Sequence, residues 1–154
     1  MEQMPTVADL RPDPTFAAFN ADWPYCLDTG LLTRAGFLER AGSELRRARR
    51  FERDLSLVRI SPLDENLDHE EFEHLVFFVQ ESVRDGIDLA GLVAHRTIML
   101  LLPETNMLGA MDFSLRLRDL ANACREPRIA DFTTRETVIR EDDESLTAIL
   151  SRCS

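Results

Sequence analysis

The chain has 154 residues, which suits a single domain with a substantial hydrophobic core. Its formal net charge of -10 argues against nucleic-acid binding and against docking on an anionic membrane, because both need a basic surface. All 18 basic residues are arginines, which excludes lysine chemistry such as Schiff-base formation. The cysteines form no CxxC pair and no apolar run is long enough to span a membrane, so we expect reduced thiols and a cytoplasmic protein.

Residues 1–24 contain four of the seven prolines and no sustained periodicity, which predicts an irregular N-terminal arm. Aromatic side chains are expected to pin this arm onto the body of the protein, since a free tail would gain nothing from them. These aromatic residues are Phe16, Phe19, Trp23 and Tyr25. The folded domain is expected to comprise residues 25–154.

Hydrophobic periodicity becomes clear from Thr33 onward and alternates between the helical and the strand pattern. The expected helices cover residues 37–48, 72–83, 110–124 and about 143–152. The expected strands cover 55–60, 88–94 and 97–102, with one or two more among 129–133 and 136–140. Helices that alternate with a few strands predict an α/β (α+β) fold, in which helices cover a mixed central sheet.

Several residues mark where these elements begin and end. Only His95 and Arg96 separate two expected strands, which is the length of a tight β-hairpin turn. Asp68 is the expected N-cap of the helix before the hairpin, and Gly86 is expected to stop that helix. Thr105 is the expected N-cap of the helix after the hairpin.

Three stretches, in this order, resemble the GGDEF domain, which is the fold of diguanylate cyclases. The first is CLDTGLLTR, residues 26–34, which is similar to the family's D-x-L-T-G-L-x-N-R opening. The second, residues 93–105, ends in L-P-E-T like the family's L-P-x-T. The third is AMDFSLRLR, residues 110–118, which resembles a family helix with A-x-x-x-x-x-R-L-R. The resemblance spans about residues 26–125 and implies a GGDEF-like sheet with one hairpin.

The signature that names this family is replaced here. Where family members read G-G-D-E-F, this chain has Ala94, His95, Arg96, Thr97 and Ile98. The family's other metal carboxylate, at the end of the first strand, corresponds to Ser61. Magnesium requires hard oxygen ligands, usually carboxylates, and a guanidinium would repel it. The resemblance therefore implies a degenerate GGDEF domain that is not an enzyme and holds no metal and no cofactor.

The nucleotide sites of the family are also altered. The segment after Ser61 lacks the G-H and G-D pairs of the family's base-binding loop. The family's product-binding motif, R-x-x-D, corresponds to Arg84 and Asp88, but the arginine stands one place too early. On a helix this shift would turn the guanidinium by roughly 100°, although a loop at Gly86 could restore it. Arg84 and Asp88 are thus the candidate nucleotide-binding residues.

The acidic chain contains one dense basic cluster, formed by Arg46, Arg47, Arg49, Arg50 and Arg53. One interpretation is a solvated helix end; the other is a surface that grips an acidic partner. Spacings of three and four residues are expected to place Arg46, Arg49, Arg50 and Arg53 on one stripe, and these are the candidate partner-binding residues.

The segment from His69 to His74 (HEEFEH) invites comparison with a zinc motif. Its two histidines are five residues apart, whereas H-E-x-x-H requires a separation of four. A solvated helix face is the favoured interpretation.

A domain that keeps its core pattern but loses its metal carboxylates is better suited to binding than to catalysis. We therefore expect a non-catalytic protein-interaction or regulatory module in bacterial signalling that binds a protein partner. The resemblance also implies that the domain can form a homodimer. The alternative is a receptor that binds cyclic di-GMP or GTP without turnover. Neither nucleic acid nor membrane is expected as a partner.

Overall fold

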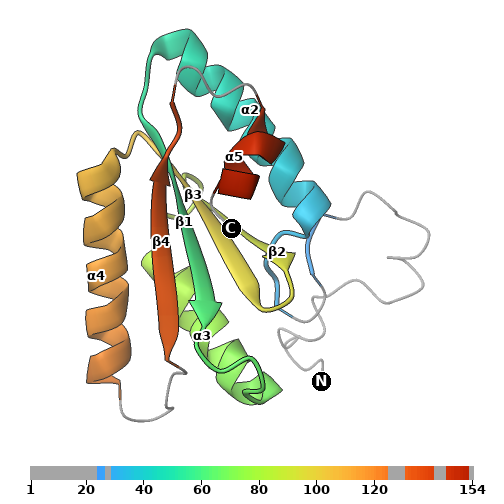
Figure 1. Ribbon diagram of the computed structural model, residues 1–154, viewed down its shortest axis with the longest axis vertical. Coiled ribbons are helices and arrows are strands. Elements are labelled where there is room, and N and C mark those ends of the chain that lie inside the picture. Colours follow the sequence, from blue (N-terminus) through green and yellow to red (C-terminus); the bar gives the residue numbers. More distant parts are fainter. Residues whose placement is uncertain (1–23, 27–28, 125–130, 141–144, 153–154) are drawn as a thin grey trace, which may run out of the picture.

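The computed structural model describes residues 24–26, 29–124, 131–140 and 145–152 (Figure 1). Its helices are α2 (Arg34–Phe51), α3 (His69–Ser82), α4 (Met107–Ala123) and α5 (Leu146–Arg152). Its strands are β1 (Leu55–Pro62), β2 (Leu89–Ala94), β3 (Thr97–Pro103) and β4 (Phe132–Val138). The expected N-terminal arm, with Phe16, Phe19 and Trp23, lies outside the described residues.

The four strands form one sheet in the order β2-β3-β1-β4, and each neighbouring pair is antiparallel. The expected α/β class is confirmed, but the sheet is antiparallel and not mixed. The helical connections explain this difference. The connections through α3 and α4 each join two strands that run in the same direction, as helical crossovers do. In both cases an antiparallel strand is inserted between the two: β3 separates β1 from β2, and β1 separates β3 from β4.

The predicted hairpin is confirmed. β2 and β3 pair directly, and His95 and Arg96 form the turn between them. At its other side β3 pairs with β1, with Ile98 opposite Ile60. The turn of the hairpin therefore lies at the same end of the sheet as the C-terminal end of β1.

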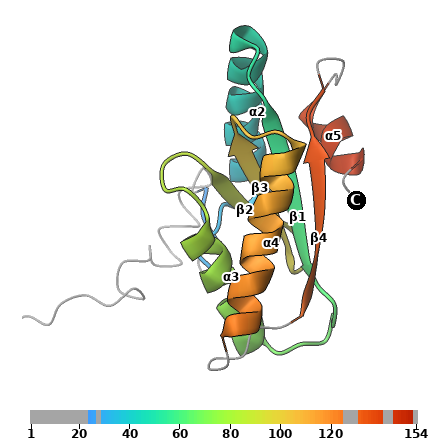
Figure 2. The same ribbon diagram turned by 90° about the vertical axis from the view of Figure 1, so that its left-hand side faces the viewer.

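Helices cover both faces of the sheet, as the two perpendicular views show (Figures 1 and 2). Successive residues of a strand point to opposite faces, and β1 follows this rule. Val58 and Ile60 pack into the core under α3 and α4, whereas Leu55 and Leu57 pack into the core under α2 and α5. The central strand is thus buried on both sides, which explains why most of its residues are apolar. None of the helices in the described ranges is long and apolar enough to cross a membrane.

α2 ends earlier than the spacing of its arginines suggests. Glu52 adopts a left-handed conformation, with φ 52° and ψ 46°, and terminates the helix after Phe51. Arg53 follows this cap, and its N–H donates to the carbonyl oxygen of Ala48. The expectation that Arg53 shares one helical stripe with the other arginines was therefore wrong, because the helical spacing does not extend to it.

The caps of the other helices were predicted in part. The Asp68 side chain accepts a hydrogen bond from the N–H of Glu71 at 2.8 Å, which confirms Asp68 as the N-cap of α3. α4 is capped by Asn106, whose side chain accepts from the Gly109 N–H at 2.9 Å. The expected Thr105 cap was wrong because the Thr105 hydroxyl donates to the carbonyl oxygen of Pro103.

Candidate functional site

The end of β1 and the hairpin bring together the positions at which the sequence departs from the GGDEF pattern. Ile60 lies opposite Ile98, so Ser61 and Thr97 are neighbours across the β1–β3 pair. The Ser61 hydroxyl is buried and makes no hydrogen bond among the described residues. The Thr97 hydroxyl donates to the carbonyl oxygen of His95 at 3.0 Å, within the turn. Hydroxyl groups thus stand side by side at the two positions that the resemblance aligns with carboxylates of the family.

Arg96 fills part of this neighbourhood with its side chain. Its guanidinium donates a short hydrogen bond to the carbonyl oxygen of Leu67 and lies over the ring of Phe72, 5.5 Å from the ring centroid. These contacts tie the hairpin to the start of α3. Arg96 also has a positive φ of 47°, in the left-handed region that favours glycine. A residue with a long side chain thus occupies a backbone conformation that glycine adopts without strain.

The residues present do not fit a divalent cation. Ser61 and Thr97 offer neutral hydroxyls, and Arg96 carries a fixed positive charge, whereas magnesium prefers carboxylate ligands in a near-octahedral array. The acidic loop nearby does not replace them: the Asp64 carboxylate accepts from the N–H of Asn66, and Asp68 caps α3. Among the described residues, no three His, Cys, Asp or Glu side chains are grouped so that they could hold a metal ion.

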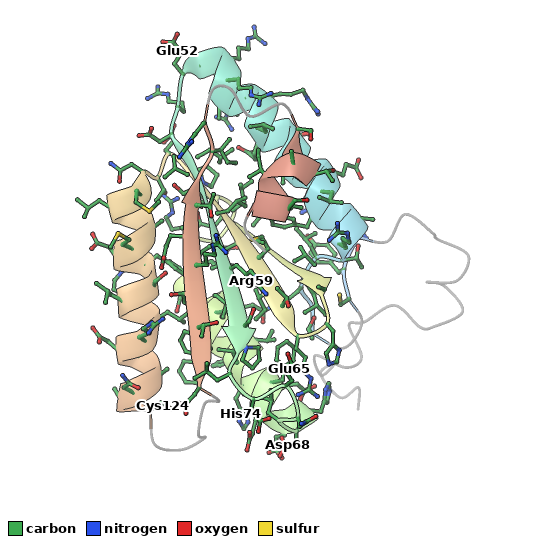
Figure 3. The ribbon with its side chains drawn as sticks, in the orientation of Figure 1. Glu52, Arg59, Glu65, Asp68, His74 and Cys124 are labelled. Atoms are coloured by element: carbon green, nitrogen blue, oxygen red, sulfur yellow. The ribbon has the colours of Figure 1, made fainter. Side chains whose placement is uncertain are left out.

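The His69–His74 segment forms the first turns of α3, at the end of the molecule where Glu65, Asp68 and His74 are labelled in Figure 3. His69 Nε2 and Glu73 Oε1 are 2.9 Å apart, and these side chains are 61% and 45% exposed. This geometry agrees with a solvated helix face for His69 and Glu73, whereas His74 is half-buried and its Nδ1 makes no hydrogen bond among the described residues.

Arg84 and Asp88 meet directly, despite the extra residue between them. Arg84 Nη2 lies 2.7 Å from Asp88 Oδ1, and the Arg84 backbone N–H donates to Asp88 Oδ2 at 2.7 Å. The Asp88 side chain is 2% exposed, while that of Arg84 is 48% exposed. The hydrogen bonds to Asp88 raise the pKa of the Arg84 guanidinium above its usual value, although burial acts in the opposite direction.

The loop between α3 and β2 explains this pairing. α3 ends at Ser82, so Arg84 is not held at a helical angle. Gly86 has a positive φ of 73°, and the N–H groups of Ile87 and Asp88 both donate to the Arg84 carbonyl oxygen, which closes a turn. The 100° offset expected for a helix does not apply, and the loop at Gly86 restores the contact.

A groove of about 530 Å³ adjoins this ion pair. Arg84 and Asp88 line one side, and α4 lines the other with Asp112, Arg116 and Asp119. The Arg84 guanidinium is also bonded to the Pro103 carbonyl oxygen at 2.8 Å, so it lies across the end of β3. Its remaining N–H groups are the ones that an anionic ligand in the groove could reach.

The basic cluster lies at the C-terminal end of α2, near the labelled Glu52 at the top of Figure 3. Arg46 donates to the Ser43 hydroxyl at 3.2 Å, and Arg50 stacks on the ring of Phe51 at 5.4 Å. Arg53 lies 3.9 Å from Glu104 with both side chains about two-thirds exposed, a pair that contributes little to stability. Arg49 makes no hydrogen bond or ion pair within the described part of the chain. Arg46, Arg49 and Arg50 therefore present unneutralised charge to solvent.

The described part of the opening motif, Cys26 and residues 29–34, is joined to the edge of the sheet. The Thr29 hydroxyl accepts from the Leu31 N–H at 3.2 Å, and Gly30 has a positive φ of 74°. Leu32 then bridges β2: its N–H donates to the carbonyl oxygen of Ala90, and its own carbonyl oxygen accepts from Leu92. This motif therefore serves to dock α2 onto the sheet.

No model of a protein family matches the sequence, and no curated protein resembles it closely enough to be found by sequence. Solved structures do resemble it in fold. The GGDEF domain of DgcB from Caulobacter crescentus, in complex with c-di-GMP, has a TM-score of 0.69 at 11% identity, with 84% of this chain and 82% of that one covered. The active GGEEF domain of a diguanylate cyclase from Vibrio cholerae has a TM-score of 0.69 at 16% identity, covering 80% and 86%. The FimX GGDEF domain from Pseudomonas aeruginosa has a TM-score of 0.70 at 14% identity, covering 84% and 88%.

The chain has a GGDEF-like fold. The likeness covers most of the chain. At these levels of identity it establishes the fold alone.

One charged residue of the sheet escaped the sequence analysis. Arg59 interrupts the apolar run of β1. It was overlooked because the run LSLVRI predicts a buried strand even though it contains one arginine. In the structure Arg59 is half-buried near the middle of the sheet, below α5 in Figure 3. The signal that could have identified it is a charged residue between two apolar ones, Val58 and Ile60, inside a strand that is expected to be buried.

Proposed function

We propose that this chain is a non-catalytic, degenerate GGDEF-like domain that acts by binding another protein in a bacterial signalling system. The observation that carries the proposal is the contact of Arg96 with Leu67 and Phe72. It puts a guanidinium, itself hydrogen-bonded and stacked, beside the positions from which a cyclase would coordinate its metal. Ser61 and Thr97 supply no carboxylate to offset this charge, so the site lacks the ligands that would hold the cation of metal-assisted phosphoryl transfer.

The partner surface in this proposal is the end of α2, formed by Arg46, Arg49 and Arg50, with Arg53 beyond the helix cap. In a chain of net charge -10, this concentrated positive surface would steer an acidic partner, while the rest of the molecule would repel it. Since none of Arg46, Arg49 and Arg50 has an acidic partner in the described part of the chain, their charges are available to another protein.

The proposal is tested by reversing two charges. The variant Arg49→Glu/Arg50→Glu should retain its melting temperature within about 2 °C, because exposed charges contribute little to stability. Its capture of the native partner from a lysate of the source organism, followed by mass spectrometry, should fall at low salt. The control Arg40→Glu/Arg116→Glu changes the net charge by the same amount at sites away from this surface and should capture the partner normally. Equal capture of the partner by the wild-type protein, the variant and the control would contradict the proposal and favour a solvated helix end.

A second candidate function is supported by a different observation. Arg84 and Asp88 are brought together beside a groove of about 530 Å³, and the DgcB domain that resembles this chain binds c-di-GMP. In this alternative the domain is a receptor that binds cyclic di-GMP or GTP without turnover. Cyclic di-GMP should then raise the melting temperature by an amount that grows with its concentration, and Arg84→Ala should abolish the increase. The absence of any shift at millimolar cyclic di-GMP and GTP would exclude this function.

A further inference from the structure

Helix α4 carries large apolar side chains on the surface that faces away from the sheet. Of the nine large hydrophobic residues that are exposed within the described ranges, five belong to this helix. They are Met107, Leu108, Met111, Leu115 and Leu120. A helix that covers one face of a sheet ordinarily turns such residues inward and exposes polar ones. α4 therefore has a second apolar surface in addition to the one that packs on the sheet.

Three of these residues form a stripe on the side of α4 opposite its buried face. The residues of α4 that are buried against the rest of the domain are Ala110, Phe113, Ser114 and Leu117. Helical geometry directs Leu108 and Leu115 away from this buried face, with Met111 beside them. These three side chains, which we call the α4 stripe, are 68%, 58% and 47% exposed, respectively. Figure 1 shows α4 at the outer edge of the molecule, where a partner can reach the stripe.

The charged residues next to the α4 stripe have no ionic partner of their own. Asp112 and Arg116 lie on one flank of the stripe, and Asp119 follows Leu115 by one turn. None of these three charges forms an ion pair among the residues that the structure describes, and Arg116 lies over the Phe113 ring at 6.0 Å from its centroid. An apolar stripe flanked by unpaired charges of both signs can be complementary to a second copy of itself.

An antiparallel arrangement of two α4 helices, with a two-fold axis near position 114, provides this complementarity. A residue that precedes this position in one copy then lies opposite the residue that follows it by the same distance in the other copy. Asp112 of each copy accordingly lies beside Arg116 of the other, and Met111 and Leu115 of the two copies pack together across the axis. Asp119 of each copy lies near the first turn of the other α4, which contains no acidic residue and whose N–H groups favour a carboxylate.

We propose that α4 pairs in antiparallel orientation with α4 of a second copy of this chain, through the stripe formed by Leu108, Met111 and Leu115. A helix of 17 residues is about 25 Å long, so this contact is smaller than a standard protein interface and gives a weak, reversible dimer. α4 packs on one face of the sheet and α2 on the other. The dimer thus leaves the end of α2 accessible and does not depend on the proposed function.

The first test is sedimentation velocity of the full chain at concentrations between about 5 and 500 µM. The wild-type protein should change from monomer to dimer, with a dissociation constant on the order of 10–100 µM. Leu115→Glu should weaken the dimer by at least about 10-fold, because it places a charge inside the apolar contact. The matched control is Leu63→Glu, at a residue that is 63% exposed just after β1, and it should dimerise like the wild-type protein. A wild-type protein that stays monomeric, or a dimer that Leu115→Glu leaves unchanged, overturns the proposal.

The second test exchanges the charges that flank the stripe and examines the orientation of the two helices. Asp112→Arg and Arg116→Asp should each weaken the homodimer by about 3- to 30-fold, because each variant places like charges opposite one another. An equal mixture of the two variants should recover the association, since every opposed pair then carries opposite charges. Recovery in the mixture also shows that both variants are folded. A mixture that associates no better than its separate components contradicts the antiparallel α4 pairing.

Discussion

Arg96 combines an unfavourable backbone conformation with two favourable side-chain contacts. Its φ of 47° is costly for any residue with a Cβ, by about 1–2 kcal/mol. The hydrogen bond to the Leu67 carbonyl oxygen and the stacking on Phe72 offset this cost. The hairpin turn is therefore stabilised by a contact with α3 and not by its own backbone preference.

These two contributions can be separated by two substitutions at position 96. Arg96→Ala loses both contacts and keeps the strained φ, so it should be destabilised by about 1–3 kcal/mol in urea unfolding. Arg96→Gly loses the same contacts but accepts a positive φ, and it should be more stable than Arg96→Ala by about 0.5–1 kcal/mol. If the alanine variant were as stable as the glycine variant, the left-handed conformation of this residue would be refuted.

Sequence and structure agree less well on single residues than on elements. The Arg84–Asp88 contact depends on the turn at Gly86, and the departure of Arg53 from the stripe depends on the left-handed Glu52. Both are decided by one φ angle at a helix end, which hydrophobic periodicity does not encode. The hydroxyl of Thr105 was equally ambiguous, because threonine can cap a helix or bond to a nearby carbonyl oxygen.

At the scale of elements, α2 is a helix whose termination can be improved. Glu52 occupies the left-handed position that follows many helices, and glycine is the residue that adopts it without a steric penalty. Nothing in the described structure compensates Glu52 through a hydrogen bond of its side chain. The C-terminal end of α2 is thus less stable than it would be with glycine at position 52.

Glu52→Gly should therefore stabilise the protein by about 0.5–1 kcal/mol, since the relief of strain exceeds the added flexibility of the unfolded chain. In a domain of this size the melting temperature should rise by about 2 °C. The matched control is Glu44→Gly inside α2, which should lower stability by about 0.5–1 kcal/mol. A loss of stability in Glu52→Gly, measured by calorimetry beside this control, would contradict the assigned end of α2.

The elements themselves were largely predictable because each depends on many residues. The apolar runs gave β1 and β3, and the two residues between β2 and β3 gave the hairpin. The antiparallel order of the sheet was not predictable from these patterns, because it depends on which strand inserts between two others. Hydrophobic periodicity predicts which face of a helix or strand is buried, whereas the order of the strands in the sheet follows from the packing of the whole chain.

At the scale of the whole molecule, the two hydrophobic cores on either side of the sheet hold the fold together. Val58, Ile60 and Leu100 pack on one side, and Leu57 and Leu101 on the other, so the fold depends on apolar volume and not on the signature residues. The hairpin signature can consequently change its chemistry while the sheet persists.

The central claim is that the chain keeps the GGDEF-like fold without cyclase chemistry, and it is tested most directly by GTP turnover. Purified protein would be incubated with GTP and either magnesium or manganese, and the products separated by chromatography, with an active diguanylate cyclase as the positive control. We expect no cyclic di-GMP from the wild-type protein, nor from Thr97→Glu, which adds one carboxylate but leaves Arg96 in place. Formation of cyclic di-GMP by the wild-type protein, at a rate that changes in Arg96→Ala, would contradict the account.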